Sequence, residues 1–347
     1  MVLGVLRGLQ SWFRPAIEAL TILNLPWEYR WRLLAFQPLT LIAYSIISLP
    51  WAFSRPWKVE WLKIAPGRTL RVLVFDDPSQ RPANQGRFRP LHLYIHQGAF
   101  IGGVPEDGAL FCVKLAKETG AVVISTSYRY APAHHFPAAI DDIDVVVKYI
   151  QMHARERWGA DPELMTTSGA SAGGNLALAL SQQPSCHPPA KTAIKGTVTF
   201  YGAIDLRLPP QDKPKPATLP KKDPFQFLLP LYDSYAAPVR AENMENPRMS
   251  PAIASANTLP ANMLLVVAGI DILVHENLTF VERIKGEIAR DPKHAGRRVE
   301  ALYIENAFHG YLSLPASVTS QALKDMAFNG GIDFIKDVHR KFGWSDN

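Results

Sequence analysis

The sequence predicts an α/β fold in which helices flank a mostly parallel central sheet, and three observations support this. From about residue 69 onward, short segments rich in Val, Ile, Leu and Thr alternate with longer helical patterns. Strands separated by helices of this length form parallel sheets with helices on both faces. A glycine-flanked serine in Gly169–Gly174 separates one such strand from a helix. Residues 203–260 interrupt the alternation with prolines and lysines, and we interpret them as an insertion over the carboxyl edge of the sheet.

The elements follow in order along the chain, each bounded by Gly, Pro or Asp. The predicted strands are Thr69–Phe75, Leu91–Ile95, Ala121–Ser127, Leu164–Ser168, Lys195–Tyr201, Met263–Ala268 and Val299–Ile304. The predicted helices are Phe136–Arg157, Ala172–Gln182, His275–Ala289 and Ser317–Lys341. We therefore divide the chain into an amino-terminal part, residues 1–60, and one main domain, residues 61–345, that carries the insertion 203–260.

Composition and charge exclude several classes of protein. The 347 residues are 47% hydrophobic and 20% charged, which is enough to bury a sizeable core. The two cysteines, Cys112 and Cys186, cannot form a disulfide framework or a four-thiolate zinc site. The net charge of +6 lies in residues 1–71, with nine basic and three acidic residues, and the rest of the chain is balanced at 28 of each. A nucleic-acid-binding domain would carry a basic stripe on its folded body, so we expect no nucleic-acid partner.

The amino-terminal part has two interpretations. Residues 3–23 show the periodicity of an amphipathic helix, and Leu33–Ser54 is a stretch of 22 residues without a charge. Six of the eight tryptophans also fall in the first 61 residues, a composition typical of membrane surfaces. Pro38 and Pro50 make the uncharged stretch only moderately apolar, so it is either membrane-associated or a soluble lid. We find no signal peptide pattern and expect an intracellular protein, cytoplasmic or membrane-associated.

The glycine-flanked serine carries the strongest chemical signal. Ser171 lies between Gly169 and Gly173, with Gly174 next, directly after the strand Leu164–Ser168. Gly-x-Ser-x-Gly between a strand and a helix is a nucleophile elbow, a sharp turn that lifts the serine hydroxyl above the sheet. Glycines are needed there because the turn brings backbone segments too close for side chains. The sequence predicts Ser171 as a nucleophile, the alternative being an ordinary serine in a glycine-rich turn.

A second loop, His96-Gln97-Gly98-Ala99, follows the strand Leu91–Ile95. Small residues here allow backbone amides to approach a substrate oxyanion. We expect Gly98 and Ala99 to contribute such amides, and we interpret the side chain of His96 as a buried, hydrogen-bonded histidine.

Two residues after later strands complete the constellation. Asp271 follows the strand Met263–Ala268, and His309 follows the strand that ends near Ile304. The order serine, aspartate, histidine is that of the Ser-His-Asp triad built on a nucleophile elbow. Alone, Asp271 could cap a helix and His309 could be a turn residue, but the order makes both triad candidates.

These motifs together resemble the hormone-sensitive-lipase-like branch of the α/β-hydrolase superfamily, which includes arylacetamide-deacetylase-like and many microbial and fungal esterases. The matching segments are His96–Ala99, Tyr128–Ala133, Phe136–Asp142, Gly169–Gly174, Ser250–Pro251, Asp271–Leu273 and His309–Gly310. The resemblance covers roughly residues 90–312. It implies an α/β-hydrolase fold with a helical cap formed by residues 1–60 and the insertion 203–260.

Five positions depart from the pattern of that family. Gln97 and Ala99 stand where the family has glycines, and Ala170 replaces the usual Asp of the elbow. His275 stands where a second Asp is common after the triad acid, and Ala133 replaces a common Glu. None of these changes removes a triad residue.

The sequence thus predicts a serine hydrolase that cleaves carboxylic esters without a metal or organic cofactor. In this prediction Ser171 attacks, His309 transfers the proton, and Asp271 orients the imidazole. The oxyanion would be held by the amides of Gly98, Ala99 and Ala172. The apolar amino terminus favours a small hydrophobic ester. Two alternatives remain: a related acyl-transfer enzyme (amidase, thioesterase, lactonase or acyltransferase), and a non-catalytic ligand-binding protein on the same scaffold.

Overall fold

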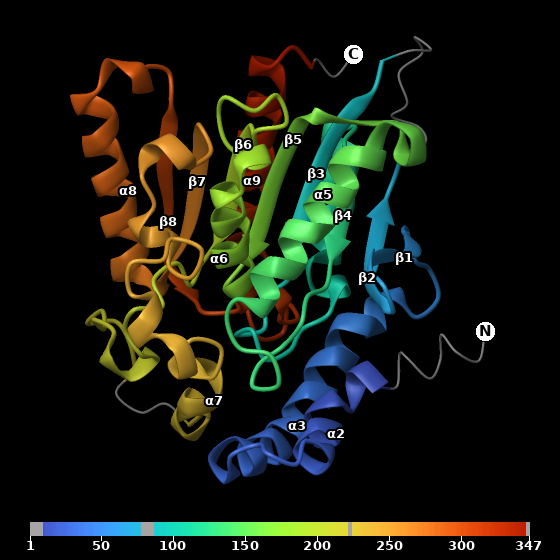
Figure 1. Cartoon of the computed structure of the whole chain (residues 1–347), viewed down its shortest axis with the longest axis vertical. Helices are drawn as coiled ribbons and strands as arrows, with labels where there is room; N and C mark the ends of the chain where they lie inside the picture. Colours follow the sequence, from blue (N-terminus) through green and yellow to red (C-terminus); the bar gives the residue numbers. More distant parts are fainter. Residues whose placement is uncertain (1–9, 78–86, 221–223, 345–347) are drawn as a thin grey trace.

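The computed structural model describes residues 10–77, 87–220 and 224–344, in which eight strands form one sheet (Figure 1). The strand order is β1-β2-β4-β3-β5-β6-β7-β8. The strands are β1 (Lys58–Ala65), β2 (Arg68–Phe75), β3 (Arg89–Ile95), β4 (Val122–Thr126), β5 (Ala160–Ala170), β6 (Gly196–Phe200), β7 (Asn262–Ile270) and β8 (Arg298–Phe308). The pairs β1–β2 and β2–β4 are antiparallel. All other neighbouring strands in the sheet are parallel. The predicted mostly parallel sheet is confirmed.

Helices cover both faces of this sheet, as predicted. The helices are α2 (Arg14–Thr21), α3 (Trp27–Ser48), α4 (Ala109–Thr119), α5 (Ala138–Trp158), α6 (Ala172–Ala179), α7 (Leu229–Asp233), α8 (Val274–Arg290) and α9 (Gln321–Lys341). Buried side chains of α5 and α6 form one core with the sheet, and α8 extends it on the same side. Side chains of α4 and α9 form the core of the opposite face. The central strands β3, β4 and β6 are buried along their whole length, which explains their continuous apolar sequences.

Outside the insertion 203–260, strand β1 and helix α4 were absent from the predicted strands and helices. Strand β1 places Lys58, Glu60 and Lys63 among apolar residues at the edge of the sheet, where charged side chains remain in water. This weakens the strand pattern in the sequence. Helix α4 has 11 residues, and its short apolar run does not distinguish a helix from a strand.

The amino-terminal segment forms helices rather than extended chain. The charge-free stretch Leu33–Ser54 belongs mostly to the longer helix α3, which begins at Trp27 and continues through Pro38. A 3₁₀ turn, Leu49–Trp51, follows it. The helix Trp27–Trp51 has a mean hydropathy of 1.6 and is long and apolar enough to cross a membrane. Helix α2 lies within the amphipathic segment 3–23, of which residues 3–9 lie outside the described chain.

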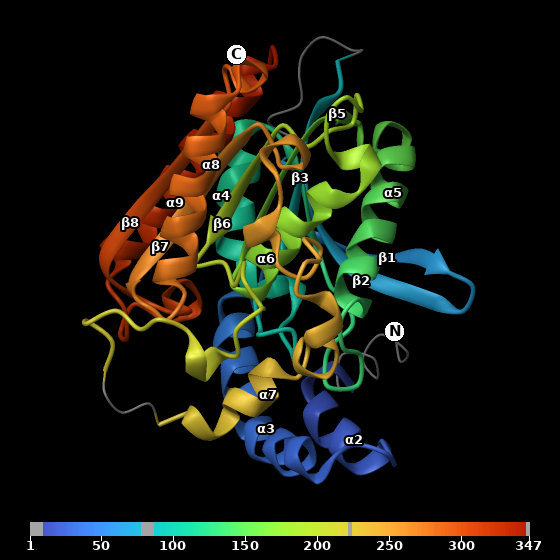
Figure 2. The same cartoon turned by 60° about the vertical axis from the view of Figure 1, so that its left-hand side comes forward.

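Helices α2, α3 and α7 lie side by side beyond the ends of the parallel strands (Figures 1 and 2). We call α2, α3 and residues 203–260 the cap. The insertion consists of short 3₁₀ turns around α7. Phe36 of α3 meets Tyr232 of α7 edge-on, with ring centroids 6.5 Å apart, and Trp31 stacks on Phe227 at 6.1 Å. These contacts join two segments 196 residues apart in the chain into one layer.

Candidate active site

Ser171 occupies the sharp turn between β5 and α6. Its backbone has φ of 51° and ψ of −117°, a left-handed conformation that costs a residue with a Cβ about 1–3 kcal/mol. A Cβ on Gly169 would lie 2.2 Å from the oxygen of Gly173, and one on Gly173 would lie 2.0 Å from the oxygen of Ile95. The turn therefore requires both glycines, and the fold holds the serine in a strained conformation.

The structure brings the three predicted triad residues together. Ser171 Oγ lies 3.0 Å from His309 Nε2, and His309 Nδ1 lies 2.7 Å from Asp271 Oδ2. An ionised carboxylate has no proton to donate, so Nδ1–H donates to Asp271 and Nε2 can accept the serine proton. Asp271 directly follows β7 and His309 directly follows β8. The two adjacent parallel strands thus deliver both side chains to the same edge of the sheet.

Asp271 makes a second hydrogen bond, but it does not cap helix α8, whose N-cap residue is Leu273. Its Oδ1 accepts a hydrogen bond of 3.0 Å from the amide of Leu273, next to the start of α8. The carboxylate is buried while the side chain of His309 is 44% exposed. Surrounding protein atoms lower the pKa of His309, but the charge and hydrogen bond of Asp271 outweigh this and raise that pKa above its ordinary value.

The loop after β3 has the backbone of an oxyanion site. Gly98, Ala99 and Phe100 have φ of 130°, 51° and 60°, so three successive residues lie in the left-handed region. A Cβ on Gly98 would lie 2.3 Å from the oxygen of Gly102, whereas Ala99 tolerates its conformation at some cost. Within the described chain, the amides of Gly98 and Ala99 donate no hydrogen bond, as a site for an incoming oxyanion requires. The amide of Ala172, at the first position of α6, is also outside the helical ladder.

His96 is buried beneath this loop. Its Nδ1 donates to the oxygen of Gln97 at 2.7 Å, and its ring stacks on Tyr128 with centroids 4.5 Å apart. Burial lowers the pKa of His96 to about 4, so the ring is neutral. This is the packed, hydrogen-bonded histidine that we expected, and it supports the loop through its contacts.

The cap reaches the far end of the same loop, which the sequence did not predict. The buried hydroxyl of Tyr44, on α3, donates to the oxygen of Gly103 at 3.1 Å and accepts from its amide at 3.0 Å. Arg14, on α2, donates to the oxygen of Ile101 and lies over the ring of Tyr130, 4.5 Å from its centroid. Helices α2 and α3 therefore hold residues 101–103 in place.

Tyr44→Phe is expected to lower the free energy of unfolding by about 1–3 kcal/mol, because it leaves the Gly103 amide without its acceptor. Urea unfolding followed by fluorescence measures the change. Tyr303→Phe, which alters an exposed ring, is the matched control and should leave the midpoint unchanged. An unchanged midpoint for Tyr44→Phe would mean that α3 does not hold the loop.

A buried ion pair lies behind the triad. Lys213 of the insertion pairs with Glu276 of α8, and both side chains are at least 90% buried. Burial raises the pKa of Glu276 to about 7, although Lys213 opposes the rise. Glu276 also accepts the amide of Asp205 at 3.2 Å. The insertion is thus tied to the helix that follows the triad acid. Neither residue was a candidate from the sequence, since a single Lys and Glu 63 positions apart form no pattern.

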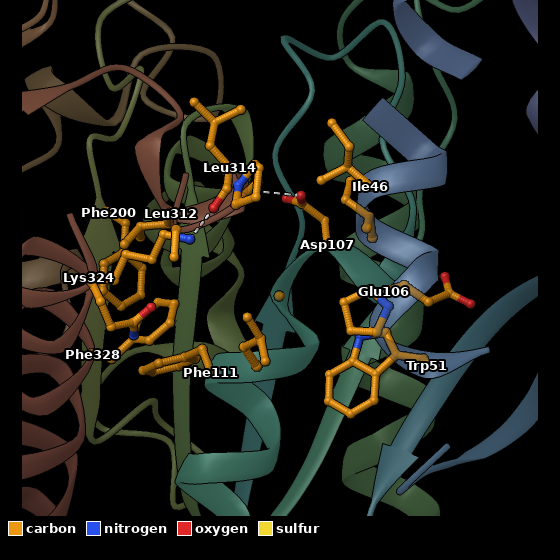
Figure 3. A pocket seen from close by; sticks show the side chains of 18 of the residues that line it. Ile46, Trp51, Glu106, Asp107, Phe111, Phe200, Leu312, Leu314, Lys324 and Phe328 are labelled. Atoms are coloured by element: carbon orange, nitrogen blue, oxygen red, sulfur yellow. Dashed lines mark hydrogen bonds between the residues drawn. The ribbon is translucent and has the colours of Figure 1, made fainter. Parts of the chain in front are cut away.

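Tyr201, at the end of β6, was also missed. Its ring meets His309 edge-on with centroids 5.1 Å apart, and its backbone has φ of 38°. The ring also borders a cavity of about 210 Å³ that lies between the end of α3 and the start of α9 (Figure 3). Figure 3 shows Asp107 facing this cavity between Ile46 and Leu312. Among the described residues, no cluster of His, Cys, Asp and Glu could hold a metal ion.

Comparisons with known proteins agree with this geometry. Residues 92–313 match a family model described as an alpha/beta hydrolase fold. Over 122 residues, which are 33% of this chain and 31% of its relative, the chain is 38% identical to rabbit (Oryctolagus cuniculus) arylacetamide deacetylase. It therefore aligns with about a third of that relative. It is 28% identical to the ethyl acetate hydrolase of Pseudomonas putida over 250 residues, 72% of this chain and 73% of that protein.

A solved structure of the Pyrobaculum calidifontis esterase superimposes with a TM-score of 0.67 at 23% identity, covering 90% of this chain and 94% of that one. At this identity the likeness concerns the fold. Together, the matched family model, the deacetylase relatives and the architecture show that this chain belongs to the α/β-hydrolase family, in its hormone-sensitive-lipase-like branch.

Proposed function

We propose that this chain is a serine carboxylic ester hydrolase that forms an acyl-enzyme on Ser171. The observation that carries the proposal is the unbroken hydrogen-bonded path from Ser171 through His309 to Asp271, with distances of 3.0 and 2.7 Å. A hydroxyl beside a base that is itself oriented by a carboxylate is an activated nucleophile. The names of the relatives, an ethyl acetate hydrolase and an arylacetamide deacetylase, support an ester or related acyl substrate.

The proposed reaction has two halves. In the first, Ser171 Oγ attacks the acyl carbon while its proton passes to His309 Nε2, and Asp271 stabilises the imidazolium. The amides of Gly98, Ala99 and Ala172 bind the developing oxyanion. The proton on His309 then passes to the departing alcohol, and the acyl group remains on Ser171. In the second half, water attacks the acyl-enzyme, His309 takes its proton, and Ser171 is released with the carboxylic acid.

The substrate we propose is a small hydrophobic ester with a short acyl group. Aromatic rings connect the oxyanion loop to the cap: Phe100 stacks on Tyr235 of the insertion with centroids 4.1 Å apart, and Phe136 meets Tyr235 edge-on at 6.0 Å. These apolar surroundings of the oxyanion loop favour an apolar substrate over a charged one. Both relatives named above act on acetyl groups by name.

A series of p-nitrophenyl esters from acetate to palmitate, with an anilide and a thioester of the same acyl group, tests this function. We expect release of p-nitrophenol with an optimum at a short acyl chain and rates on the anilide at least about 100-fold lower, since an amine leaves less readily. Faster release from the thioester or anilide would identify the chain as a thioesterase or amidase. Tight ligand binding without release from any ester would favour the non-catalytic alternative.

We also propose that the cap binds a membrane surface without crossing it. Large apolar side chains are exposed at both ends of helix α3, among them Leu20, Leu23, Trp27, Leu49 and Phe53. Leu23 is 90% exposed and Phe53 is fully exposed, and burying each in lipid would contribute about 1.5–3 kcal/mol. Crossing a bilayer would require α3 to give up the Tyr44–Gly103 contact and the bonds from Gln37 to α2 and Trp12.

Flotation with vesicles of phosphatidylcholine and phosphatidylserine measures this binding. We expect the protein to float with the vesicles and to be released by carbonate at high pH, as a surface-bound protein is. Leu23→Ser combined with Phe53→Ser should weaken the partition at least about tenfold. Met152→Ser, at an exposed apolar residue on α5, is the control and should have no effect. A wild-type protein that stays with the soluble fraction would contradict the proposal and leave the cap as a soluble lid.

A further inference from the structure

Gln97 is one of the five departures from the family pattern, and it lies in the oxyanion loop. It precedes Gly98 in the oxyanion loop, at a position where the family has glycine. A glycine at this position would offer no side chain for a contact. The side chain of Gln97 instead makes three polar contacts with segments that are distant in sequence.

Those contacts form a chain of hydrogen bonds with one consistent direction. The Tyr201 hydroxyl donates to Gln97 Oε1 at 3.0 Å, and Gln97 Nε2 donates to Ser313 Oγ at 2.7 Å. The Ser313 hydroxyl then donates to Asp107 Oδ1 at 2.7 Å, a bond drawn in Figure 3. Gln97 Nε2 also lies 3.5 Å from the same Asp107 oxygen. Each donated proton in this chain of hydrogen bonds has an acceptor. The chain ends on the Asp107 carboxylate, and a hydrogen bond to a carboxylate is stronger than one between neutral groups.

Two of the three partners of Gln97, Ser313 and Tyr201, belong to the surroundings of His309. Ser313 ends the 3₁₀ turn Tyr311–Ser313, which begins two residues after His309. The ring of Tyr201 meets the imidazole edge-on, with centroids 5.1 Å apart. The side chain of Gln97 therefore links the loop that carries the oxyanion amides to the loop that carries the general base.

The loop needs such support because of its backbone. Ala99 and Phe100 have positive φ, and successive strained residues persist only where the surroundings determine them. Tyr44 and Arg14 hold the far end of the loop, at residues 101–103. Gln97 holds its near end. An oxyanion site acts through amides fixed before the reaction begins. Holding both ends of the loop in place should therefore increase the rate of ester hydrolysis.

We infer that Gln97 is a positioning residue, which fixes the amides of Gly98 and Ala99 relative to His309 through Tyr201, Ser313 and Asp107. The inference rests on the proposed esterase activity of the same site. It assigns to Gln97 an effect on the transition state and little effect on the binding of the ester, since its side chain contacts protein groups.

Gln97→Ala and Gln97→Gly test this inference through two linked readouts. We expect kcat for a p-nitrophenyl ester to fall about 10- to 100-fold with little change in KM, less than the loss of a whole oxyanion donor. Ser171 Oγ attacks the carbonyl carbon of a trifluoromethyl ketone, and the serine proton passes to His309. The ketone oxygen then lies in the oxyanion site as an oxyanion. The inhibition constant of the ketone should rise by the same factor as kcat falls, because both report the same amides.

Two further variants separate positioning from packing. Ser313→Ala should lower kcat in the same direction, and the double variant with Gln97→Ala should lose little more than the single one, since both break one chain. Gln183→Ala is the matched control: a buried glutamine that bonds to Asp144 at 3.5 Å in another part of the fold. We expect it to lower the melting temperature and to leave kcat and the ketone constant unchanged.

The result that would overturn the inference is a Gln97→Ala protein that behaves like the Gln183→Ala control, with a lower melting temperature but unchanged kcat and ketone inhibition. Failure of the proposed function would look different. In that case the wild-type protein would not hydrolyse any ester or bind the ketone, whatever residue occupies position 97.

Discussion

Ser171→Ala is expected to lower ester hydrolysis by about 10⁴-fold or more, while the protein stays folded. Ser171 Oγ is the oxygen placed 3.0 Å from His309 Nε2 at the strained turn, and alanine removes it without enlarging the side chain. The residual rate would come from the oxyanion amides and substrate binding alone. Initial rates on p-nitrophenyl butyrate measure the loss, with thermal unfolding as the check on folding.

Ser181→Ala is the matched control for this experiment. Ser181 is also a buried serine, in the 3₁₀ turn that follows α6, and its hydroxyl donates to the oxygen of Leu178 at 2.7 Å. We expect it to keep nearly the full rate. A Ser171→Ala protein that retained a tenth of the wild-type activity would show that another group attacks the ester.

Asp271→Asn is expected to lower kcat by about 10³- to 10⁴-fold and to move the acid limb of the pH profile to lower pH. The base must be neutral to accept the serine proton, so the rate rises with pH through the pKa of His309. Asp271 raises that pKa above its ordinary value of 6.5. Removing its charge therefore lowers the pKa, and the limb shifts down while the maximal rate falls, because the imidazole loses its orientation.

The measurement is kcat/KM for one p-nitrophenyl ester between pH 4.5 and 9, for the wild type, Asp271→Asn and a control variant. Asp205→Asn is the control, a carboxylate of the insertion that pairs with Arg207 at 2.7 Å. It should leave the limb in place. An Asp271→Asn protein whose limb stayed at the wild-type pH would mean that another group controls the titration.

Sequence reasoning could reach the fold and the triad because both leave local patterns. The elbow needs glycines at positions 169 and 173, where a Cβ would come within 2.2 Å of backbone atoms. Asp271 and His309 each follow a parallel strand, and strand order alone brings such positions to one edge. Central strands buried on both faces read as continuous apolar runs, so most of the sheet was also predictable.

The supports of the oxyanion loop could not be predicted in the same way. The contact between Tyr44 and Gly103 joins residues 59 positions apart, and the one between Gln97 and Ser313 joins residues 216 positions apart. Such contacts depend on how the cap docks and on the path of the loop after His309, for which no periodicity exists. Strand β1 was not predicted for another reason. The edge of a sheet tolerates charged side chains, and these interrupt the apolar pattern by which a strand is recognised.

Labelling with diethyl p-nitrophenyl phosphate tests the central claim most directly. Its phosphorus would be attacked by Ser171 Oγ, with loss of p-nitrophenolate and transfer of the serine proton to His309, leaving a stable diethylphosphoryl serine. Intact mass and peptide mapping should find one label per chain, on the peptide that contains Ser171, with ester hydrolysis lost in proportion. No label in the Ser171→Ala protein is expected. A label on another residue, or ester hydrolysis that continues at the full rate in the phosphorylated protein, would contradict the account.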